Sequence, residues 1–149
     1  KPENLRELAT NGVRISFIGR TQLLPKDVQE EMTRLTENTK HHDKLDVHFA
    51  IAYGGREEIL DAISALAKKI KEGTIQEVSQ ELFEKHLYLQ SEPDLIIRTG
   101  GEKRTSNFLV WQSWYSEWLF LDKLWPEFEK EDLVHALDNF AQRERRFGK

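Results

Sequence analysis

Four short apolar stretches of the 149-residue chain predict β-strands. Residues 13–18 alternate apolar and polar side chains, which is typical of a strand with one buried face. Residues 45–53 contain an almost continuous apolar run, which favours burial on both faces, as in a parallel sheet. Residues 95–97 follow a Pro-Asp pair and end before two glycines, as a strand with a sharp exit does. Residues 119–121 form the last and shortest run.

Apolar residues recur at helical spacing between these strands. The predicted helices cover residues 25–41, 57–71, 79–87 and 130–146, and residues 1–10 have the pattern of the end of a further helix. Because strands and helices alternate, we expect an α/β fold with an open, mainly parallel sheet flanked by helices and right-handed crossovers. This length predicts a single domain over residues 1–149 that buries about two-thirds of its unfolded surface.

Three cations follow the third predicted strand within seven residues: Arg98, Lys103 and Arg104. Gly100 and Gly101 can adopt positive φ and would expose backbone N–H groups to a ligand. Ligands of open α/β sheets bind beyond the carboxyl ends of the strands. The pattern therefore predicts an anion site, for a phosphate or a diphosphate. The alternative is an ordinary solvated loop.

Hydroxyl side chains continue the pattern at Thr99, Thr105 and Ser106. The pair Ser106-Asn107 predicts the cap of a helix over residues 108–115, whose N-terminal dipole would also favour an anion. The spacing of a Walker A loop is absent, and no GxGxxG follows a strand. A P-loop or a dinucleotide site therefore has no support.

Composition narrows the possible classes of protein. The net charge of −4 provides no overall basic field for nucleic acid. The absence of cysteine excludes disulfides and thiolate zinc sites. No signal peptide or 18-residue apolar run occurs, so we expect a cytoplasmic protein that does not span a membrane. His41 and His42 are adjacent and would not face one metal, so we expect structural or exposed roles for them.

A second glycine pair, Gly54-Gly55, joins the second strand to the helix that follows it. Glycines at such a turn can approach a phosphate, and they are also the ordinary solution to a tight turn. For Arg56 we favour an ion pair with Glu57 or Glu58 over a role in the anion site.

Several segments together resemble the cis-prenyltransferases, the undecaprenyl diphosphate synthase family. They are IRTGGEKRTSNFLVWQSWYSEWLF, LWPEF, the terminal RERRFG and, upstream, AIAYGGREEI. The resemblance covers nearly the whole chain. It implies a transferase of isoprenoid biosynthesis that condenses isopentenyl diphosphate with an allylic diphosphate in cis geometry, with Mg2+ as cofactor. Peripheral membrane association through the lipid product would follow.

The resemblance also implies roles for individual residues. The diphosphate of the isopentenyl substrate would be held by Arg98, Arg104, Thr105 and Ser106. Glu117 would bind magnesium, although from its position alone it could equally be a solvent-facing strand residue. The terminal Arg146 and Gly148 match an Arg-x-Gly pattern that reaches across a dimer to the partner's diphosphate site, so we expect a homodimer. We expect dimer and core contacts, rather than a prenyl tunnel, for Trp111, Trp114 and Trp118.

One departure from the family pattern is large. The HxxxMDGNxRWA segment, whose Asp is the family's principal magnesium ligand, has no counterpart here, and neither has an Asn-Trp-x-Arg-Pro pattern. The chain therefore resembles the back half to two-thirds of such an enzyme, and we expect it to be inactive alone. The alternative is a non-catalytic partner subunit or diphosphate-binding module. Related subunits of that kind lose the RTxGExRxSNF stretch, which this chain retains.

Overall fold

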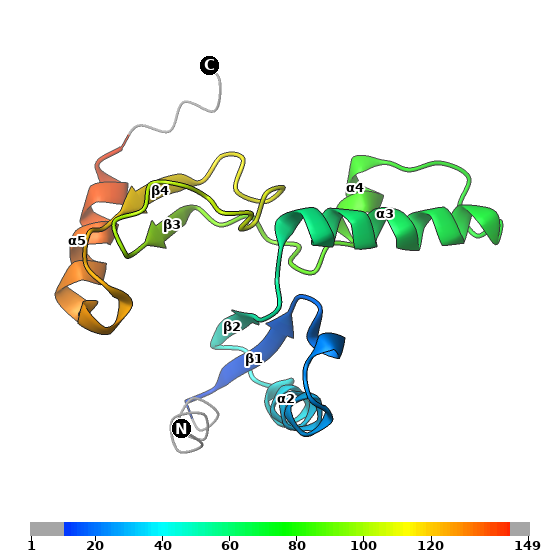
Figure 1. Cartoon of the computed structure of the whole chain (residues 1–149), viewed down its shortest axis with the longest axis horizontal. Helices are drawn as coiled ribbons and strands as arrows, with labels where there is room; N and C mark the ends of the chain where they lie inside the picture. The colour runs from blue at the N-terminus through cyan, green and yellow to red at the C-terminus, as the bar shows by residue number, and fades with distance from the viewer. Residues whose placement is uncertain (1–10, 144–149) are drawn as a thin grey trace.

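The computed structural model describes residues 11–143, in which helices follow each of four strands except β3, which is joined to β4 by turns (Figure 1). The predicted helix over residues 1–10 lies outside these described residues, and the one predicted over residues 130–146 ends earlier, at Ala141. The elements are β1 (Val13–Ile18), η1 (Thr21–Leu23), α2 (Lys26–Thr39), β2 (Leu45–Ala50), α3 (Gly55–Lys71), α4 (Gln80–Glu84), β3 (Leu95–Arg98), β4 (Glu117–Phe120), η2 (Trp125–Glu127) and α5 (Lys130–Ala141).

The strands pair in parallel, as predicted, and form two separate pairs. In the first pair, β1 lies beside β2 with Val13 opposite Leu45. In the second, β3 lies beside β4 with Leu95 opposite Glu117 and Arg98 opposite Phe120. Figure 1 shows α2 beside β1, α3 and α4 together on one side of the molecule, and α5 beside β4 on the other. The α/β fold with parallel sheets flanked by helices is therefore confirmed.

The best-packed core lies between β1 and α2. Alternation along β1 directs Val13 and Ile15 into this core, where Met32 and Leu35 of α2 are also buried. The backbone N–H of Ile15 donates to Thr39 Oγ1 at 3.0 Å, and Thr39 Oγ1 donates in turn to the Leu35 carbonyl at 2.8 Å. A fully buried hydroxyl is thus satisfied on both sides, and it ties the end of the helix to the strand.

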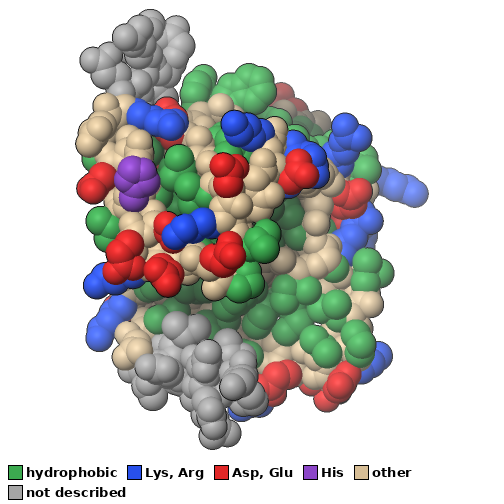
Figure 2. Space-filling model, turned by 60° about the vertical axis from the view of Figure 1, so that its left-hand side comes forward, with side chains coloured by type: hydrophobic (Ala, Val, Ile, Leu, Met, Phe, Trp, Pro, Cys, Tyr) green, Lys and Arg blue, Asp and Glu red, His purple; other side chains and the backbone are tan. Residues whose placement is uncertain are grey.

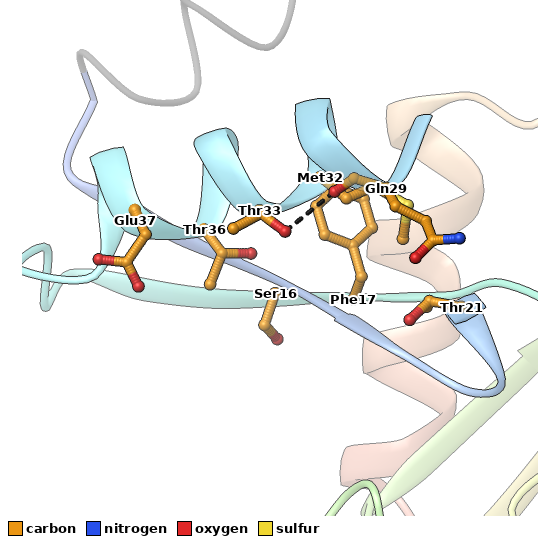
Figure 3. Close-up of a pocket in the computed structure, with 8 residues that line it drawn as sticks. All are labelled: Ser16, Phe17, Thr21, Gln29, Met32, Thr33, Thr36 and Glu37. Carbon is orange, nitrogen blue, oxygen red and sulfur yellow. Dashed lines mark hydrogen bonds between the residues drawn. The ribbon is translucent and has the colours of Figure 1, made fainter. Parts of the chain in front are cut away.

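A groove of about 260 Å³ runs beside this core, between β1 and α2 (Figure 3). Phe17 points up toward the helix, whereas Ser16 points to the other face of the strand. Hydroxyl and amide side chains line most of it, and Glu37 brings its one carboxylate. None of the residues predicted to bind a diphosphate lines this groove.

The segment between β3 and β4 differs from its prediction. Residues 106–115 form a series of turns rather than the predicted helix. Ser106, Asn107 and Leu109 have φ of 48°, 66° and 44°. A helix needs φ near −60°, so three left-handed residues in four exclude one. Within these turns, the side chains of Leu109 and Gln112 are both buried.

The surface is larger than expected for a chain of this mass. The accessible area is 11112 Å², against about 7,900 Å² for a compact protein of this size. An unfolded chain of this mass would expose about 25,000 Å², so folding buries a little over half of that surface rather than two-thirds. Figure 2 shows charged side chains of both signs over the upper part of one face and a broad hydrophobic area below them. Among residues 11–143, large apolar side chains such as Trp114 and Trp125 are therefore exposed, at 78% and 73%.

Candidate functional site

Arg98 closes the loop that follows β3. We call residues 98–107 the arginine loop. Arg98 Nη1 donates to the backbone carbonyl of Arg104 and, at 3.0 Å, to Ser106 Oγ. Its Nε and Nη2 groups have no hydrogen-bond partner among residues 11–143. The Arg98 guanidinium therefore links the two ends of the arginine loop through Nη1. Its Nε–H and Nη2–H groups remain available to an anion.

Gly100 and Gly101 adopt positive φ as predicted, 93° and 73°. Their predicted role as N–H donors to a ligand is wrong. The Gly100 N–H donates to the Lys123 carbonyl at 2.8 Å, and the Gly101 N–H donates to the Leu121 carbonyl at 2.9 Å. The glycines therefore anchor the arginine loop to the segment that follows β4, because the left-handed turn aims both amides at that backbone.

The other cations of the loop are exposed. Arg104 Nη1 donates to Glu102 Oε2 at 2.5 Å, and more than half of each side chain is accessible to solvent. Such an exposed pair contributes little to stability, so an incoming anion could displace the carboxylate at little cost. Lys103 and Thr105 are also exposed. The structure thus brings Arg98, Arg104 and Ser106 together, with Thr105 beside them in the chain.

Glu117 lies away from this cluster within one chain. It starts β4 opposite Leu95, three residues before the position opposite Arg98. The offset corresponds to about 10 Å along the sheet. Its carboxylate accepts from Arg143 Nη1 at 2.5 Å, and 28% of the side chain is exposed. It is thus a partly exposed, ion-paired strand residue.

Magnesium prefers oxygen ligands in octahedral geometry and is often held by one or two carboxylates together with substrate phosphates and water. Within residues 11–143, no three His, Asp or Glu side chains gather as a metal site would require. The described residues therefore offer a single predicted ligand, Glu117, and that ligand is engaged by Arg143. They do not make a complete site for a resident magnesium ion.

Asn107 connects the arginine loop to the start of α3. Its carbonyl accepts the Gly55 N–H at 2.7 Å, its Oδ1 accepts the Arg56 N–H at 2.8 Å, and its Nδ2 donates to Glu57 Oε2 at 2.9 Å. The predicted role of Ser106-Asn107 as the cap of a helix over residues 108–115 is wrong, because no helix follows them, and Asn107 instead bonds to the start of α3, 51 residues earlier. The N–H groups of Gly55 and Arg56 are therefore occupied by protein and not open to a phosphate.

The predicted ion pair of Arg56 with Glu57 or Glu58 is wrong. Arg56 has no ion pair within residues 11–143, and Glu57 bonds to Asn107. Glu58 is only 1% exposed. Its carboxylate accepts four donors, namely the Tyr53 hydroxyl, the Tyr88 and Leu89 N–H groups at 2.7 and 3.1 Å, and Gln112 Nε2 at 3.0 Å. Sequence reasoning missed this buried carboxylate, because its partners come from distant segments.

A second polar cluster lies one turn along α3. Arg20 donates twice to Asp61, at 2.9 and 2.7 Å, and the Tyr88 hydroxyl donates to the same carboxylate. The Arg20 guanidinium and then the Tyr88 hydroxyl lower the pKa of Asp61. Burial, followed by the bond to Asp61, raises the pKa of Tyr88 to about 12. The cluster joins the end of β1 to α3 and to the segment before β3.

Some aromatic side chains pack against one another, whereas others are exposed to solvent. Trp111 stacks edge to face on Phe83 with centroids 4.7 Å apart, and Trp118 stacks on Phe120 at 5.7 Å. Trp114 is 78% exposed and lines a pocket of about 520 Å³ with Trp111. Arg146 and Gly148, the predicted cross-dimer residues, lie outside the described residues.

Comparison with known proteins places this geometry in a family. Residues 2–148 match the family model described as "Putative undecaprenyl diphosphate synthase". The chain is 49% identical over 143 residues to a tritrans,polycis-undecaprenyl-diphosphate synthase (geranylgeranyl-diphosphate specific) of Methanocaldococcus jannaschii, covering 92% of this chain and 51% of that protein. It is 46% identical over 138 residues to an isoprenyl transferase of Thermotoga maritima, covering 91% and 59%. The chain thus spans little more than half the length of these relatives.

Two solved structures have the same fold. Lavandulyl diphosphate synthase from Lavandula x intermedia, in complex with dimethylallyl diphosphate, superposes with a TM-score of 0.95 at 33% identity, over 99% of this chain and 66% of that one. A probable undecaprenyl diphosphate synthase from Campylobacter jejuni gives 0.87 at 39% identity, over 99% and 69%. None of the helices among the described residues is long and apolar enough to cross a membrane.

Proposed function

Because this chain belongs to the undecaprenyl diphosphate synthase family of prenyltransferases, we propose that it takes part in cis-prenyl transfer. The reaction condenses isopentenyl diphosphate with an allylic diphosphate and gives a cis-polyprenyl diphosphate. The observation that carries the proposal is the closure of the arginine loop by Arg98, which leaves guanidinium donors beside Ser106 and Arg104.

The arginine loop has the chemistry to hold the diphosphate of isopentenyl diphosphate. Arg98 and Arg104 supply charge-assisted donors, and the hydroxyls of Thr105 and Ser106 can donate to the remaining oxygens. A guanidinium is preferred over an ammonium where planar, bidentate contact with a phosphate is needed. The loop therefore binds the nucleophilic substrate by its charged end and leaves the alkene free.

The arginine loop contributes to the reaction by holding the diphosphate end of isopentenyl diphosphate in place. The allylic C–O bond breaks, its electron pair leaves with the diphosphate, and an allylic cation remains. The alkene of isopentenyl diphosphate forms the new C–C bond, and a proton leaves to regenerate a double bond. Arg98 and Arg104 orient the nucleophile and offset the charge of its diphosphate, which lowers the entropic and electrostatic parts of the barrier.

Among the described residues, Glu117 is the one proposed magnesium ligand. In this family's chemistry the ion would neutralise diphosphate charge. Glu117 could contribute one oxygen ligand once Arg143 is displaced, with diphosphate oxygens and water completing the shell.

A homodimer would bring the separated residues together. Because Arg98 and Glu117 stand at opposite ends of β3–β4, about 10 Å apart along the strands, we propose that they act on one diphosphate across two copies of the chain. In a dimer, Arg146 and Gly148 of one copy would complete the site of the other. We place the protein in the cytoplasm, with peripheral membrane association arising from the lipid product.

Binding and turnover test different parts of this proposal. Calorimetry with isopentenyl diphosphate and Mg2+ should show binding by the chain, and Arg104→Ala should weaken it about tenfold. Labelled isopentenyl and farnesyl diphosphates should give no elongation with this chain alone, since it holds no HxxxMDGNxRWA segment. Robust elongation would contradict the assignment of the catalytic Asp to that segment.

The second candidate is a non-catalytic partner subunit or a diphosphate-binding module. The engagement of Glu117, the one predicted magnesium ligand, by Arg143 favours it. The retained RTGGEKRTSNF stretch favours the enzyme. A pure scaffold would show no magnesium-dependent affinity for isopentenyl diphosphate, and Arg104→Ala would change nothing.

A further inference from the structure

The contact between Asn107 and α3 joins two segments that are 51 residues apart in sequence. Asn107 uses its carbonyl, its Oδ1 and its Nδ2, and each makes one bond to the first turn of the helix. The amide of Asn107 is also the main reason that the pKa of Glu57 lies below its ordinary value. The side chain is therefore held at both of its polar atoms.

Backbone strain marks the same place. Ser106 and Asn107 both lie in the left-handed region, which costs about 1–2 kcal/mol for a residue with a β-carbon. Asn tolerates this region better than most residues, and Ser does not share that preference. Such strain persists only where surrounding contacts over-determine the conformation. The bonds of Asn107 to α3 supply those contacts.

The strained conformation has a consequence at the predicted diphosphate site. Ser106 precedes Asn107 directly, and its Oγ accepts from Arg98 Nη1 at 3.0 Å. The same Nη1 group also holds the Arg104 carbonyl. A change in the φ of Asn107 would swing Ser106 and remove one of the two acceptors that orient the Arg98 guanidinium.

The start of α3 is shaped to receive Asn107. A β-carbon on Gly54 would lie 2.2 Å from Glu57 Oε2 and 2.7 Å from Asn107 Nδ2. A β-carbon on Gly55 would lie 2.7 Å from the side chain of Val110 and 2.9 Å from its backbone nitrogen. Gly54 therefore allows the arginine loop to approach the helix, and Gly55 allows the approach of Val110 in the turns that follow the loop, which explains this pair without a bound phosphate.

We propose that Asn107 is a positioning residue for diphosphate binding. Its three hydrogen bonds to the first turn of α3 set the orientation of Ser106 and, through Ser106, the orientation of the Arg98 guanidinium. The inference rests on the proposed function and deepens it. Asn107 need not touch the substrate. It fixes the loop before the substrate arrives, so its loss raises the conformational cost of binding.

The first test exchanges donor and acceptor between Asn107 and Glu57. Asn107→Asp keeps the acceptor for the Arg56 N–H but places a carboxylate against Glu57, so isopentenyl diphosphate with Mg2+ should bind about tenfold more weakly by calorimetry. Adding Glu57→Gln supplies an amide that donates to the new carboxylate, and binding should return to within about twofold of the wild type. A general loss of structure would not be rescued by this exchange.

The second test acts from the helix side. Gly54→Ala leaves an extended backbone that any residue adopts and pushes apart the Glu57 and Asn107 side chains. It should weaken binding as Asn107→Asp does, while the circular dichroism spectrum stays unchanged. Asn38→Ala, on an exposed position of α2, is the matched control and should bind as the wild type does.

Arg98→Ala separates failure of this inference from failure of the proposed function. If the wild type binds isopentenyl diphosphate and Arg98→Ala weakens binding, the proposed function stands. Unchanged binding by both Asn107→Asp and Gly54→Ala would then overturn the positioning role alone. If the wild type binds neither isopentenyl diphosphate nor inorganic pyrophosphate, the proposed function itself is overturned.

Discussion

Glu117 and Arg143 form an ion pair at 2.5 Å, between the first residue of β4 and the second residue after the end of α5. The pair occupies the one carboxylate that we propose for magnesium. A cation at Glu117 must therefore compete with a guanidinium, and the bond is partly exposed, so competition is feasible.

This competition gives the first prediction. Glu117→Gln should abolish the magnesium dependence of isopentenyl diphosphate binding, because the amide is a poor ligand for the ion. Arg143→Gln should instead lower the magnesium concentration needed for half-maximal binding, because it frees the carboxylate. Titration of Mg2+ at fixed substrate, followed by calorimetry, measures both effects. Equal magnesium dependence in all three proteins would exclude Glu117 as a ligand.

The second prediction concerns the buried carboxylate of Glu58. Glu58→Ala should reduce the free energy of unfolding by about 3 kcal/mol, because it leaves four donors without their acceptor in the interior. Urea unfolding followed by tryptophan fluorescence measures the change. Glu77→Ala, at an exposed loop position, should change the unfolding free energy by less than about 0.5 kcal/mol. A similar effect of the two substitutions would contradict the role of Glu58 as the shared acceptor of these four hydrogen bonds.

The third prediction follows from the cluster of Arg20, Asp61 and Tyr88. Asp61 has a lowered pKa in the fold, first through Arg20 and then through Tyr88. A group with a lowered folded pKa stabilises the fold above its unfolded pKa, near 3.9, and this stability is lost as the pH falls through the folded value. Asp61→Asn should therefore flatten the acid limb of the stability curve.

Tyr88 titrates at the other end of the same curve. Its pKa is raised to about 12, from about 10 in an unfolded chain. The neutral hydroxyl therefore contributes stability that is fully present below pH 10 and is lost as the pH rises toward 12. Tyr88→Phe should remove this alkaline dependence and, because the hydroxyl also helps to lower the pKa of Asp61, should reduce the acid limb without abolishing it. Urea midpoints between pH 3 and pH 11 would show the two limbs separately.

The fourth prediction compares two glycines with positive φ. Gly100 has φ of 93°, and a β-carbon added there would have no atom within 4 Å, so Gly100→Ala should cost only backbone strain, about 1 kcal/mol. Gly19 has φ of 111°, and a β-carbon there would lie 2.4 Å from the Ile51 carbonyl oxygen. Gly19→Ala should therefore destabilise the protein by more than twice as much in urea unfolding. Equal losses would show that the contact with Ile51 relaxes freely.

Local patterns predicted the regular elements well. The alternation from Val13 to Ile18 matches β1 at both ends, and the helical spacing after Pro25 matches α2 within two residues. Both signals arise from which side chains a neighbouring layer buries, and that information lies within a short window of sequence. The cap at Ser79 was also correctly predicted, and its side chain accepts the Leu82 N–H at 3.2 Å.

Contacts between distant segments account for what could not be predicted. The spacing after Ser106 fits a helix, but the bonds of Asn107 to α3 favour a left-handed backbone there. The sequence predicts that the amides of Gly100 and Gly101 face a ligand, and instead they pair with carbonyls beyond β4. The offset between Arg98 and Glu117 depends on strand register, which no local pattern specifies when a strand is only four residues long.

The fifth prediction tests the proposed homodimer through Trp114. Trp114 is 78% exposed and lines a pocket together with Val110, Trp111 and Tyr115. Large exposed aromatic side chains are enriched at protein interfaces and dominate their energetics. Trp114→Ser should therefore weaken self-association at least tenfold by sedimentation equilibrium, without changing the unfolding midpoint of the monomer.

Leu23→Ser provides the matched control for Trp114→Ser. Leu23 is 70% exposed, but it lies in η1 and not in residues 108–125, which hold all four tryptophans and which we call the aromatic segment. If the dimer contact lies on the aromatic segment, Leu23→Ser should leave the dissociation constant unchanged. Equal weakening by both substitutions would indicate non-specific association of apolar surface. Interfaces of standard size form below about 100 μM. A wild-type chain that stays monomeric at that concentration would therefore contradict the homodimer.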